Sequence, residues 1–202
     1  MYLNLSFVTW KWIQEAVKYF PQEFIYNLKT HPFCEESLCA KYYVSQYVWN
    51  NFLPQISETW LPEITNNNYW SISHKKWVFF VGVSNQKIGL DIELLQEKSI
   101  ELLEYFPKQL YRKLWWKSWE NFYFLWTAIE ALYKFEQFQD EIILEEIYCE
   151  SVEWIFALQS EIIFSKRIVL QFKSKKYQIF SGISQNRLYS VCSFENLTYE
   201  TL

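Results

Sequence analysis

Residues 70–93, WSISHKKWVFFVGVSNQKIGLDIE, carry the strongest strand pattern that the fold prediction starts from. Residues 70–83 are rich in β-branched and aromatic side chains, which is typical of a strand. The polar residues 84–87 predict a turn, and residues 88–94 predict the strand that returns from it. This stretch therefore predicts a β-hairpin within an antiparallel sheet.

The returning strand carries two acids in an otherwise apolar run, IGLDIE at 88–93. Side chains alternate between the two faces of a strand, so Asp91 and Glu93 point one way while Leu90 and Ile92 point the other. Two neighbouring carboxylates repel each other unless a cation, a proton or another partner lies between them. The sequence thus predicts a site on one face of this strand.

The rest of the chain predicts an α+β fold. Apolar and polar residues alternate over 2–9 as in a strand, and helical periodicity follows over 10–20 and 35–53. Residues 54–69 are typical of a loop, 99–138 are helical with Pro107 opening a helix, and 141–195 contain several strands.

Two segments of the chain resemble each other without a gap. Residues 74–89 (HKKWVFFVGVSNQKIG) align with 174–189 (SKKYQIFSGISQNRLY), although 77–84 also align with 188–195. A structural repeat is one interpretation and a chance match between two aromatic, lysine-rich stretches is the other. In the first alignment His74, Asp91 and Glu93 stand opposite Ser174, Val191 and Ser193. These three ionisable side chains therefore occur only once, as in a functional site added to a scaffold.

Composition excludes several classes of protein. Half of the 202 residues are hydrophobic, with 11 Trp, 15 Tyr and 17 Phe, and no apolar run is long enough to span a bilayer. With no signal-peptide pattern at its start, the chain is expected to be cytoplasmic and not to bind membranes. The net charge of −4 argues against nucleic acid, and the three glycines form no glycine-rich phosphate loop. The four cysteines form no CxxC pair and the chain has two histidines, so free thiols are expected rather than zinc.

A second chemistry-bearing segment is the helix predicted over 122–135, FYFLWTAIEALYKF. Its large apolar side chains share one arc of the helix, and Thr127, Glu130, Ala131 and Lys134 share the opposite arc. Glu130 and Lys134 stand at i and i+4, where an acid and a base form a pair on a solvated surface. Taken alone, this helix favours a solvated face with a Glu130–Lys134 salt bridge over a functional site.

Three blocks in order resemble the 4′-phosphopantetheinyl transferase superfamily, in particular its larger single-chain members. The blocks are WSISHK at 70–75, IGLDIE at 88–93 and LWTAIEALYK at 125–134. The resemblance implies two similar α+β halves related by a pseudo-two-fold axis, each a small antiparallel sheet packed with a long helix. It implies that residues 1–98 carry the SxH and GxDxE motifs and that 99–202 carry the WTxxEAxxK helix.

The resemblance also implies an activity. Such enzymes transfer the phosphopantetheine arm of coenzyme A to a serine of an apo acyl or peptidyl carrier protein and release 3′,5′-ADP. Asp91, Glu93 and Glu130 would hold Mg²⁺, which suits hard oxygen ligands beside a pyrophosphate. Glu130, directly or through a water, would take the serine proton, and Lys134 would balance the pyrophosphate. The monomeric state of these enzymes is expected here too.

Coenzyme A would be held by polar and basic side chains outside the metal site. The residues that the resemblance assigns to this role are Ser73, His74, Lys75, Lys134 and Lys41.

Three departures from the family pattern remove positive charge. Ile129 stands where the family usually has lysine before the glutamate, and Leu61 stands in the segment where the family commonly has Gly-Lys-Pro. In FCEESLCAKYYV, residues 33–44, Lys41 is the one basic residue. A non-catalytic relative that binds a carrier or another protein is therefore a second hypothesis. A metal-dependent phosphohydrolase is a third, although it would usually use more His and Asp ligands.

Overall fold

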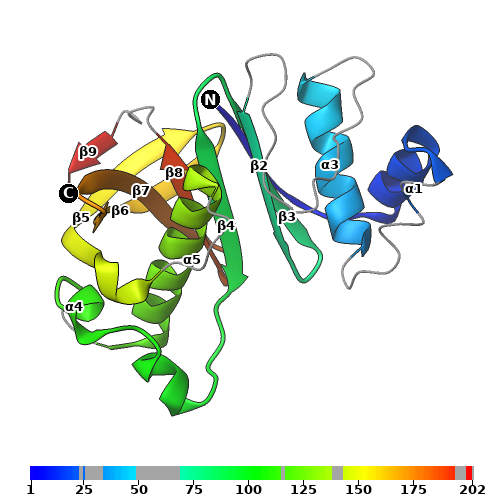
Figure 1. The fold of residues 1–202 in the computed structure, drawn as a ribbon. Helices are drawn as coiled ribbons and strands as arrows, with labels where there is room; N and C mark the ends of the chain where they lie inside the picture. The colour runs from blue at the N-terminus through cyan, green and yellow to red at the C-terminus, as the bar shows by residue number, and fades with distance from the viewer. Residues whose placement is uncertain are drawn as a thin grey trace.

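The computed structural model describes residues 1–22, 25, 34–48, 69–114, 117–137, 143–193 and 199–201. These residues form an α+β fold with two sheets, in which neighbouring strands are antiparallel (Figure 1). The first sheet has the strand order β1-β3-β2, and the second has the order β4-β8-β7-β6-β5-β9. The strands are β1 (Tyr2–Phe7), β2 (Tyr69–Lys75), β3 (Val78–Ser84), β4 (Ile88–Leu94), β5 (Ile147–Gln159), β6 (Ile162–Phe172), β7 (Lys175–Ser184), β8 (Arg187–Ser193) and β9 (Tyr199–Thr201).

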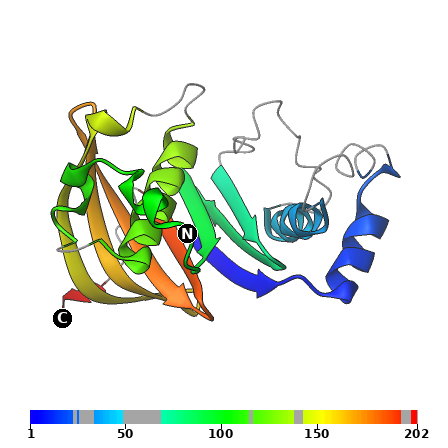
Figure 2. The same ribbon diagram turned by 90° about the horizontal axis from the view of Figure 1, so that it is seen from below.

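Helices cover the outer face of each sheet. The helix α3 (Cys34–Val48) lies on the first sheet, and α1 (Trp10–Tyr19) packs against α3. The helix α5 (Trp119–Glu136) crosses the second sheet over β4, β8 and β7 (Figure 2). The short helix α4 (Lys108–Tyr111) and the 3₁₀ turns Ile100–Glu104 and Leu144–Glu146 flank α5. Hydrophobic side chains fill the space between successive layers, so the described chain is stacked as helices, sheet, sheet and helix.

The predicted single strand over 70–83 is wrong, because it is a hairpin of its own. β2 ends at Lys75, Lys76 and Trp77 form the turn with φ of 45° and 66°, and β3 begins at Val78. Two-residue hairpin turns with positive φ at both residues usually contain Asn, Asp or Gly, which tolerate this conformation. Lys-Trp carries no such signal, so this turn could not be recognised in the sequence.

The predicted hairpin between this segment and residues 88–94 is also wrong. β4 pairs with β8, far along the chain, and Asp91 lies opposite Ser190. On its other edge β4 faces β2, where Ser71 Oγ accepts the Leu90 N–H at 3.1 Å and Ser73 Oγ accepts the Ile92 N–H at 3.3 Å. The boundary between the sheets therefore falls between β3 and β4, inside the expected first half.

The alignment of residues 74–89 with residues 174–189 does not place the hairpin turn of the first sheet on a hairpin turn of the second sheet. It places Lys76 and Trp77 on residues 176 and 177, which lie within β7. The corresponding hairpin turn of the second sheet is at Lys173 and Ser174, which also have positive φ. A pseudo-two-fold relation is therefore not shown by this alignment.

Most of the other expected elements are confirmed where the structure describes them. A strand and a helix occupy 2–7 and 10–19, helix α3 covers most of 35–53, and β5 to β8 occupy 147–193. The remainder of 35–53 and the predicted loop over 54–68 lie outside the described residues. The helical stretch 99–138 is divided into three pieces, with Pro107 immediately before α4 as expected.

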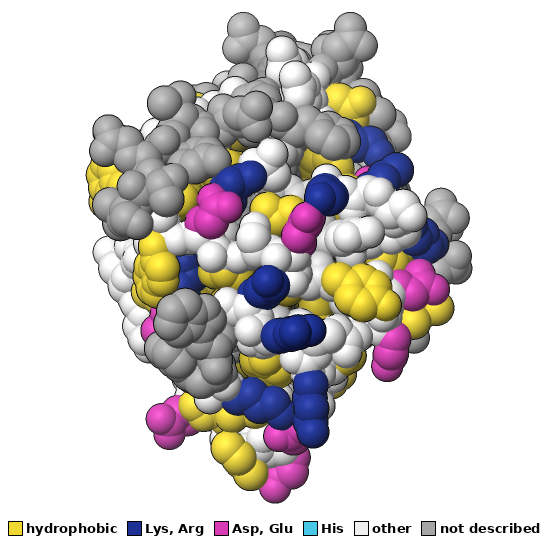
Figure 3. All heavy atoms as spheres, turned by 90° about the vertical axis from the view of Figure 1, so that its left-hand side faces the viewer, with side chains coloured by type: hydrophobic (Ala, Val, Ile, Leu, Met, Phe, Trp, Pro, Cys, Tyr) yellow, Lys and Arg dark blue, Asp and Glu magenta, His cyan; other side chains and the backbone are white. Residues whose placement is uncertain are grey.

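The described surface and helices add two observations. No helix among the described residues is long and apolar enough to cross a membrane. On the face shown in Figure 3, lysine and arginine side chains are interspersed with acidic and hydrophobic ones.

Cys39, Cys149 and Cys192 are buried free thiols, as expected, while the side chain of Cys34 lies outside the described residues.

Candidate active site

Strand β4 divides its side chains between two layers, as predicted. Leu90 and Ile92 belong to the hydrophobic core between the sheets. Asp91 lies on the opposite face, where it contacts a residue of α5. The motif therefore presents its carboxylates to α5 and its apolar side chains to the core.

Gly89 permits the close packing of α5 on β4. A Cβ atom at this position would lie 2.0 Å from the carbonyl oxygen of Ala131 and 2.4 Å from the backbone nitrogen of Phe135. Both are backbone atoms of α5 and cannot move aside independently, so a side chain here would push the helix away. The glycine of the GxDxE block thus sets the distance between Asp91 and the following turns of the helix.

Asp91 is the centre of the site. It is 6% exposed, and its Oδ1 accepts hydrogen bonds from Ser73 Oγ at 2.8 Å and from Lys134 Nζ at 2.7 Å. Its Oδ2 is buried and has no hydrogen-bond partner within the described part of the chain. Leaving a buried anionic oxygen without a partner is costly, so this atom favours an added cation.

Glu93 and Glu130 bring further negative charge to the same place. Glu93 forms an ion pair with Lys75 at 2.9 Å. Burial raises the pKa of Glu130 above its ordinary value of 4.5, and the charge of Asp91 raises it further, with a smaller contribution from Glu93. The Lys134 ammonium lowers this pKa, yet its ion pair is with Asp91. The isolated surface pair between Glu130 and Lys134 is therefore not what this helix forms.

The oxygen atoms of these carboxylates are suitable ligands for a small divalent cation, but the distances between the carboxylates are not those of a metal site. Asp91, Glu93 and Glu130 offer only hard oxygen atoms, and they outnumber the ammonium groups of Lys75 and Lys134 that neutralise them. In the described ranges, however, no group of three or more His, Cys, Asp or Glu side chains has the spacing of a metal site. We interpret the two lysines as the counterions that a metal would partly replace.

His74 has a partner that the sequence did not reveal. Its Nδ1 lies 3.1 Å from Oε2 of Glu36, a residue of α3 whose side chain is 4% exposed. Glu36 also accepts the backbone N–H of Trp77 in the β2–β3 turn. An acidic pair in the first turn of a helix was the only signal for Glu36, because the contact joins segments 38 residues apart.

Lys41 is placed differently from the other expected cofactor-binding residues. Its ammonium donates to Ser37 Oγ at 2.6 Å, one turn earlier in α3, and the residue is 4% exposed. Burial lowers its pKa to about 8.

The two positions at which the family usually has a lysine are Leu61 and Ile129. Leu61 lies outside the described residues, whereas Ile129 is 6% exposed and packs as an apolar side chain.

Buried hydroxyl groups fasten α5 to the second sheet beside Asp91. Thr127 Oγ1 lies 2.7 Å from Ser190 Oγ, which in turn lies 2.7 Å from Ser181 Oγ. All three residues are fully buried, and Ser190 is opposite Asp91 in the β4–β8 ladder. The threonine of the helix block therefore helps to position Glu130 and Lys134.

A cavity of about 340 Å³ adjoins Glu130. It is lined largely by aromatic rings, including those of Tyr105, Phe106, Trp126 and Tyr133. Tyr105 is 53% exposed and stands at 5.5 Å from the Trp126 ring, measured between ring centres. The site thus combines a carboxylate cluster with an open aromatic surface.

Comparison with known proteins adds no family assignment. No protein-family model matches the chain, and no curated protein matches it significantly.

Proposed function

We propose that the protein is a Mg²⁺-dependent 4′-phosphopantetheinyl transferase that modifies a serine of an apo acyl or peptidyl carrier protein. The observation that carries the proposal is the environment of Asp91. One of its oxygen atoms accepts bonds from Ser73 and Lys134, whereas the other is buried without a partner among the described residues. Residues from all three sequence blocks therefore meet at one carboxylate, and its Oδ2 is available to a metal ion.

The chemistry assigns a role to each residue of this cluster. Asp91, Glu93 and Glu130 would hold Mg²⁺, which when bound supplies positive charge to the pyrophosphate of coenzyme A. The serine oxygen forms a bond to phosphorus, the phosphoanhydride bond breaks, and 3′,5′-ADP departs with its electron pair. The serine proton passes to Glu130, directly or through a water, and the raised pKa of this carboxyl suits a base. Lys134 would turn from Asp91 to the pyrophosphate, and Ser73, His74 and Lys75 would bind coenzyme A phosphates.

The transfer is tested by incubating the protein with coenzyme A, Mg²⁺ and a panel of apo acyl and peptidyl carrier proteins. The proposal expects one carrier to gain the mass of a phosphopantetheine group, and chelation of the metal to abolish the gain. No gain on any carrier, with a protein shown to be folded, would refute the proposal.

A second candidate is a non-catalytic relative that binds a carrier or another protein. It is favoured by the way the expected coenzyme A residues are occupied: His74 is bound to Glu36, Lys75 to Glu93, and Lys41 is buried against Ser37. The aromatic cavity beside Glu130 would then serve a protein partner. Calorimetry separates the candidates, because this one predicts tight carrier binding with no uptake of coenzyme A in the presence of Mg²⁺.

The finer architecture belongs to the same proposal. Two similar halves, 1–98 and 99–202, related by a pseudo-two-fold axis are what a large single-chain transferase would have. The proposal also includes a cytoplasmic location, where the enzyme would meet coenzyme A and its carrier substrates. A monomeric state is the last part of the proposal.

A further inference from the structure

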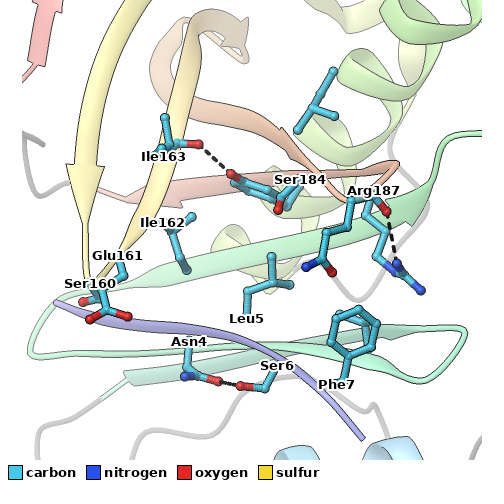
Figure 4. Close-up of a pocket in the computed structure, with 14 residues that line it drawn as sticks. Asn4, Leu5, Ser6, Phe7, Ser160, Glu161, Ile162, Ile163, Ser184 and Arg187 are labelled. Carbon is cyan, nitrogen blue, oxygen red and sulfur yellow. Dashed lines mark hydrogen bonds between the residues drawn. The ribbon is translucent and has the colours of Figure 1, made fainter.

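The free edge of β1 borders a cavity on the side of the molecule that the candidate active site does not use. We call this cavity the β1 groove; residues 4–7 form one wall, and residues 160–163 and 183–187 form most of the other (Figure 4). Its volume is about 330 Å³. β1 is the edge strand of the first sheet, so one row of its backbone groups faces this groove.

The hydrogen bonds of β1 identify which backbone groups face outward. The N–H of Leu3 donates outward to Ser160 Oγ at 3.4 Å, whereas the N–H of Val8 donates inward to Trp77 O at 2.8 Å. Because outward and inward groups alternate along a strand, Leu5 and Phe7 also direct their N–H and C=O groups outward. No acceptor within the described residues takes these two N–H groups. Such an unpaired edge is a template for an added strand.

The groove opens progressively along β1. Leu3 is 1% exposed and belongs to the core between the sheets, Leu5 is half-buried, and Phe7 is 47% exposed. Across from them lie Ile162 and Ile163. An extended chain beside β1 would therefore find apolar surface for alternate side chains. From Asn4 to Phe7 a strand advances about 10 Å, which corresponds to roughly three residue steps.

Opposite charges stand at the two ends of the groove. Arg187 lies at the Phe7 end, with its guanidinium 5.4 Å from the centre of the Phe7 ring, and donates to the carbonyl oxygens of Gln185 and Lys76. Each of its terminal nitrogens keeps a second N–H, and no carboxylate of the described chain is within ion-pair distance of it. Glu161 is exposed at the other end, beside Ser160.

We propose that the β1 groove binds the free carboxyl-terminal end of an extended polypeptide as an added strand parallel to β1. The terminal carboxylate pairs with Arg187, and a basic residue three positions before it meets Glu161. The outward N–H and C=O groups of Leu5 and Phe7 form the ladder between them. This orientation follows from charge, because an antiparallel strand would place the carboxylate beside Glu161. The site is independent of the proposed transferase function.

The test uses the full chain and N-acetylated tetrapeptides that begin with Lys, contain Val, Thr or Ala at the other positions, and end in a free carboxylate. We expect at least one to bind with a Kd of roughly 1 mM or below, in the range of a weak strand addition. Binding should protect the amides of Leu5 and Phe7 from hydrogen exchange, measured by NMR. Amidation of the peptide carboxylate should weaken binding at least tenfold, and N-methylation of the backbone amides that face β1 should abolish it.

Protein variants complete the test. Arg187→Gln should weaken binding about tenfold, whereas Arg167→Gln, which alters an arginine paired with Glu153 on the second sheet, should not. The proposal is overturned if no peptide of the set binds, or if binding is indifferent to amidation or N-methylation. Protection at a different strand would overturn it equally. The two peptide modifications need no protein variant, so a variant that fails to fold does not weaken the test.

Discussion

The ammonium of Lys134 lies 2.7 Å from Oδ1 of Asp91, and it joins the last turn of α5 to the middle of β4. The contact links two of the three sequence blocks, and Ser73 adds the other block to the same oxygen at 2.8 Å. The ion pair neutralises only part of the local negative charge, because burial and the nearby charge of Asp91, with a smaller contribution from Glu93, still raise the pKa of Glu130. Two lysines, Lys75 and Lys134, thus pair with the carboxylates of β4.

Replacing Lys134 tests whether a metal can take its place. Lys134→Met leaves the Asp91 carboxylate buried without a counterion, so we expect a loss of roughly 1–3 kcal/mol in the free energy of unfolding. The loss is smaller than for a fully buried pair because the Lys134 side chain is 22% exposed. Thermal denaturation should show that millimolar Mg²⁺ restores more stability to this variant than it adds to the unmodified protein.

The matched control for that experiment is Lys11→Met. Lys11 forms an exposed i, i+4 pair with Glu15 at 3.9 Å, so its loss should alter stability by no more than about 0.5 kcal/mol. Equal responses of both variants to Mg²⁺ would contradict a metal site at Asp91.

Gly89→Ala tests the contact that sets the distance between β4 and α5. The added methyl would meet backbone atoms of the helix at 2.0 and 2.4 Å, so we expect a loss of about 3 kcal/mol or more. Gly182→Ala is a matched control, because its methyl would meet Ile163 O at 2.3 Å, away from the carboxylates. Both variants should be destabilised in chemical denaturation, but only Gly89→Ala should lose the stabilisation by Mg²⁺.

Glu130→Gln should stabilise the protein while removing its activity. A raised pKa means that ionised Glu130 is less favourable in the folded state than in the unfolded state. The unfolded chain releases this proton first as the pH rises above about 4.5, so the folded state loses stability through that window and stays penalised at neutral pH. We expect the variant to have a Tm about 2–4 °C higher at pH 7, the shift that roughly 1 kcal/mol produces in a chain of this size.

The pH dependence supplies the check on that explanation. The difference in Tm between Glu130→Gln and the unmodified protein should shrink as the pH falls toward 4, where the carboxyl is protonated in both states. A difference that is constant with pH would show that charge at Glu130 is not the cause.

Glu36→Ala tests the contact of α3 with His74 and the β2–β3 turn. Its carboxylate accepts the Trp77 N–H and contacts His74, so its removal leaves a turn amide without a partner and should cost about 1–3 kcal/mol. The adjacent Glu35 is exposed in the same helical turn, so Glu35→Ala should change the free energy of unfolding by less than about 0.5 kcal/mol. Comparable losses in both variants would mean that the effect lies in the helix and not in the contact with β2 and its turn.

Local features of this site could be predicted from the sequence, whereas its long-range pairings could not. The alternation that sends Asp91 toward α5 and Leu90 toward the core follows from strand geometry alone. The helix that bears Glu130 and Lys134 follows from its periodicity. In the structure α5 begins at Trp119, and Ser118 before it caps the helix by accepting the N–H of Asn121.

The features that could not be predicted from the sequence are an unusual turn and contacts between distant segments of the chain. The Lys76–Trp77 turn has positive φ without a residue that favours it, so the sequence predicts one strand where β2 and β3 are two. β4 pairs with β8 on one edge, and on its other edge β2 presents serine hydroxyls and not a backbone ladder. No local pattern encodes either choice, and the same holds for the contact between Glu36 and His74.

The most direct test of the central claim is the intact mass of an apo carrier protein after incubation with coenzyme A and Mg²⁺. The unmodified protein and Asp91→Asn should be compared, with Asp91→Asn first shown to be folded by circular dichroism. We predict that the carrier gains one phosphopantetheine group with the unmodified protein and at least a hundredfold more slowly, or not at all, with Asp91→Asn. Equal transfer by both proteins would contradict the role of Asp91 as a metal ligand, and the absence of transfer to every carrier would contradict the proposed function itself.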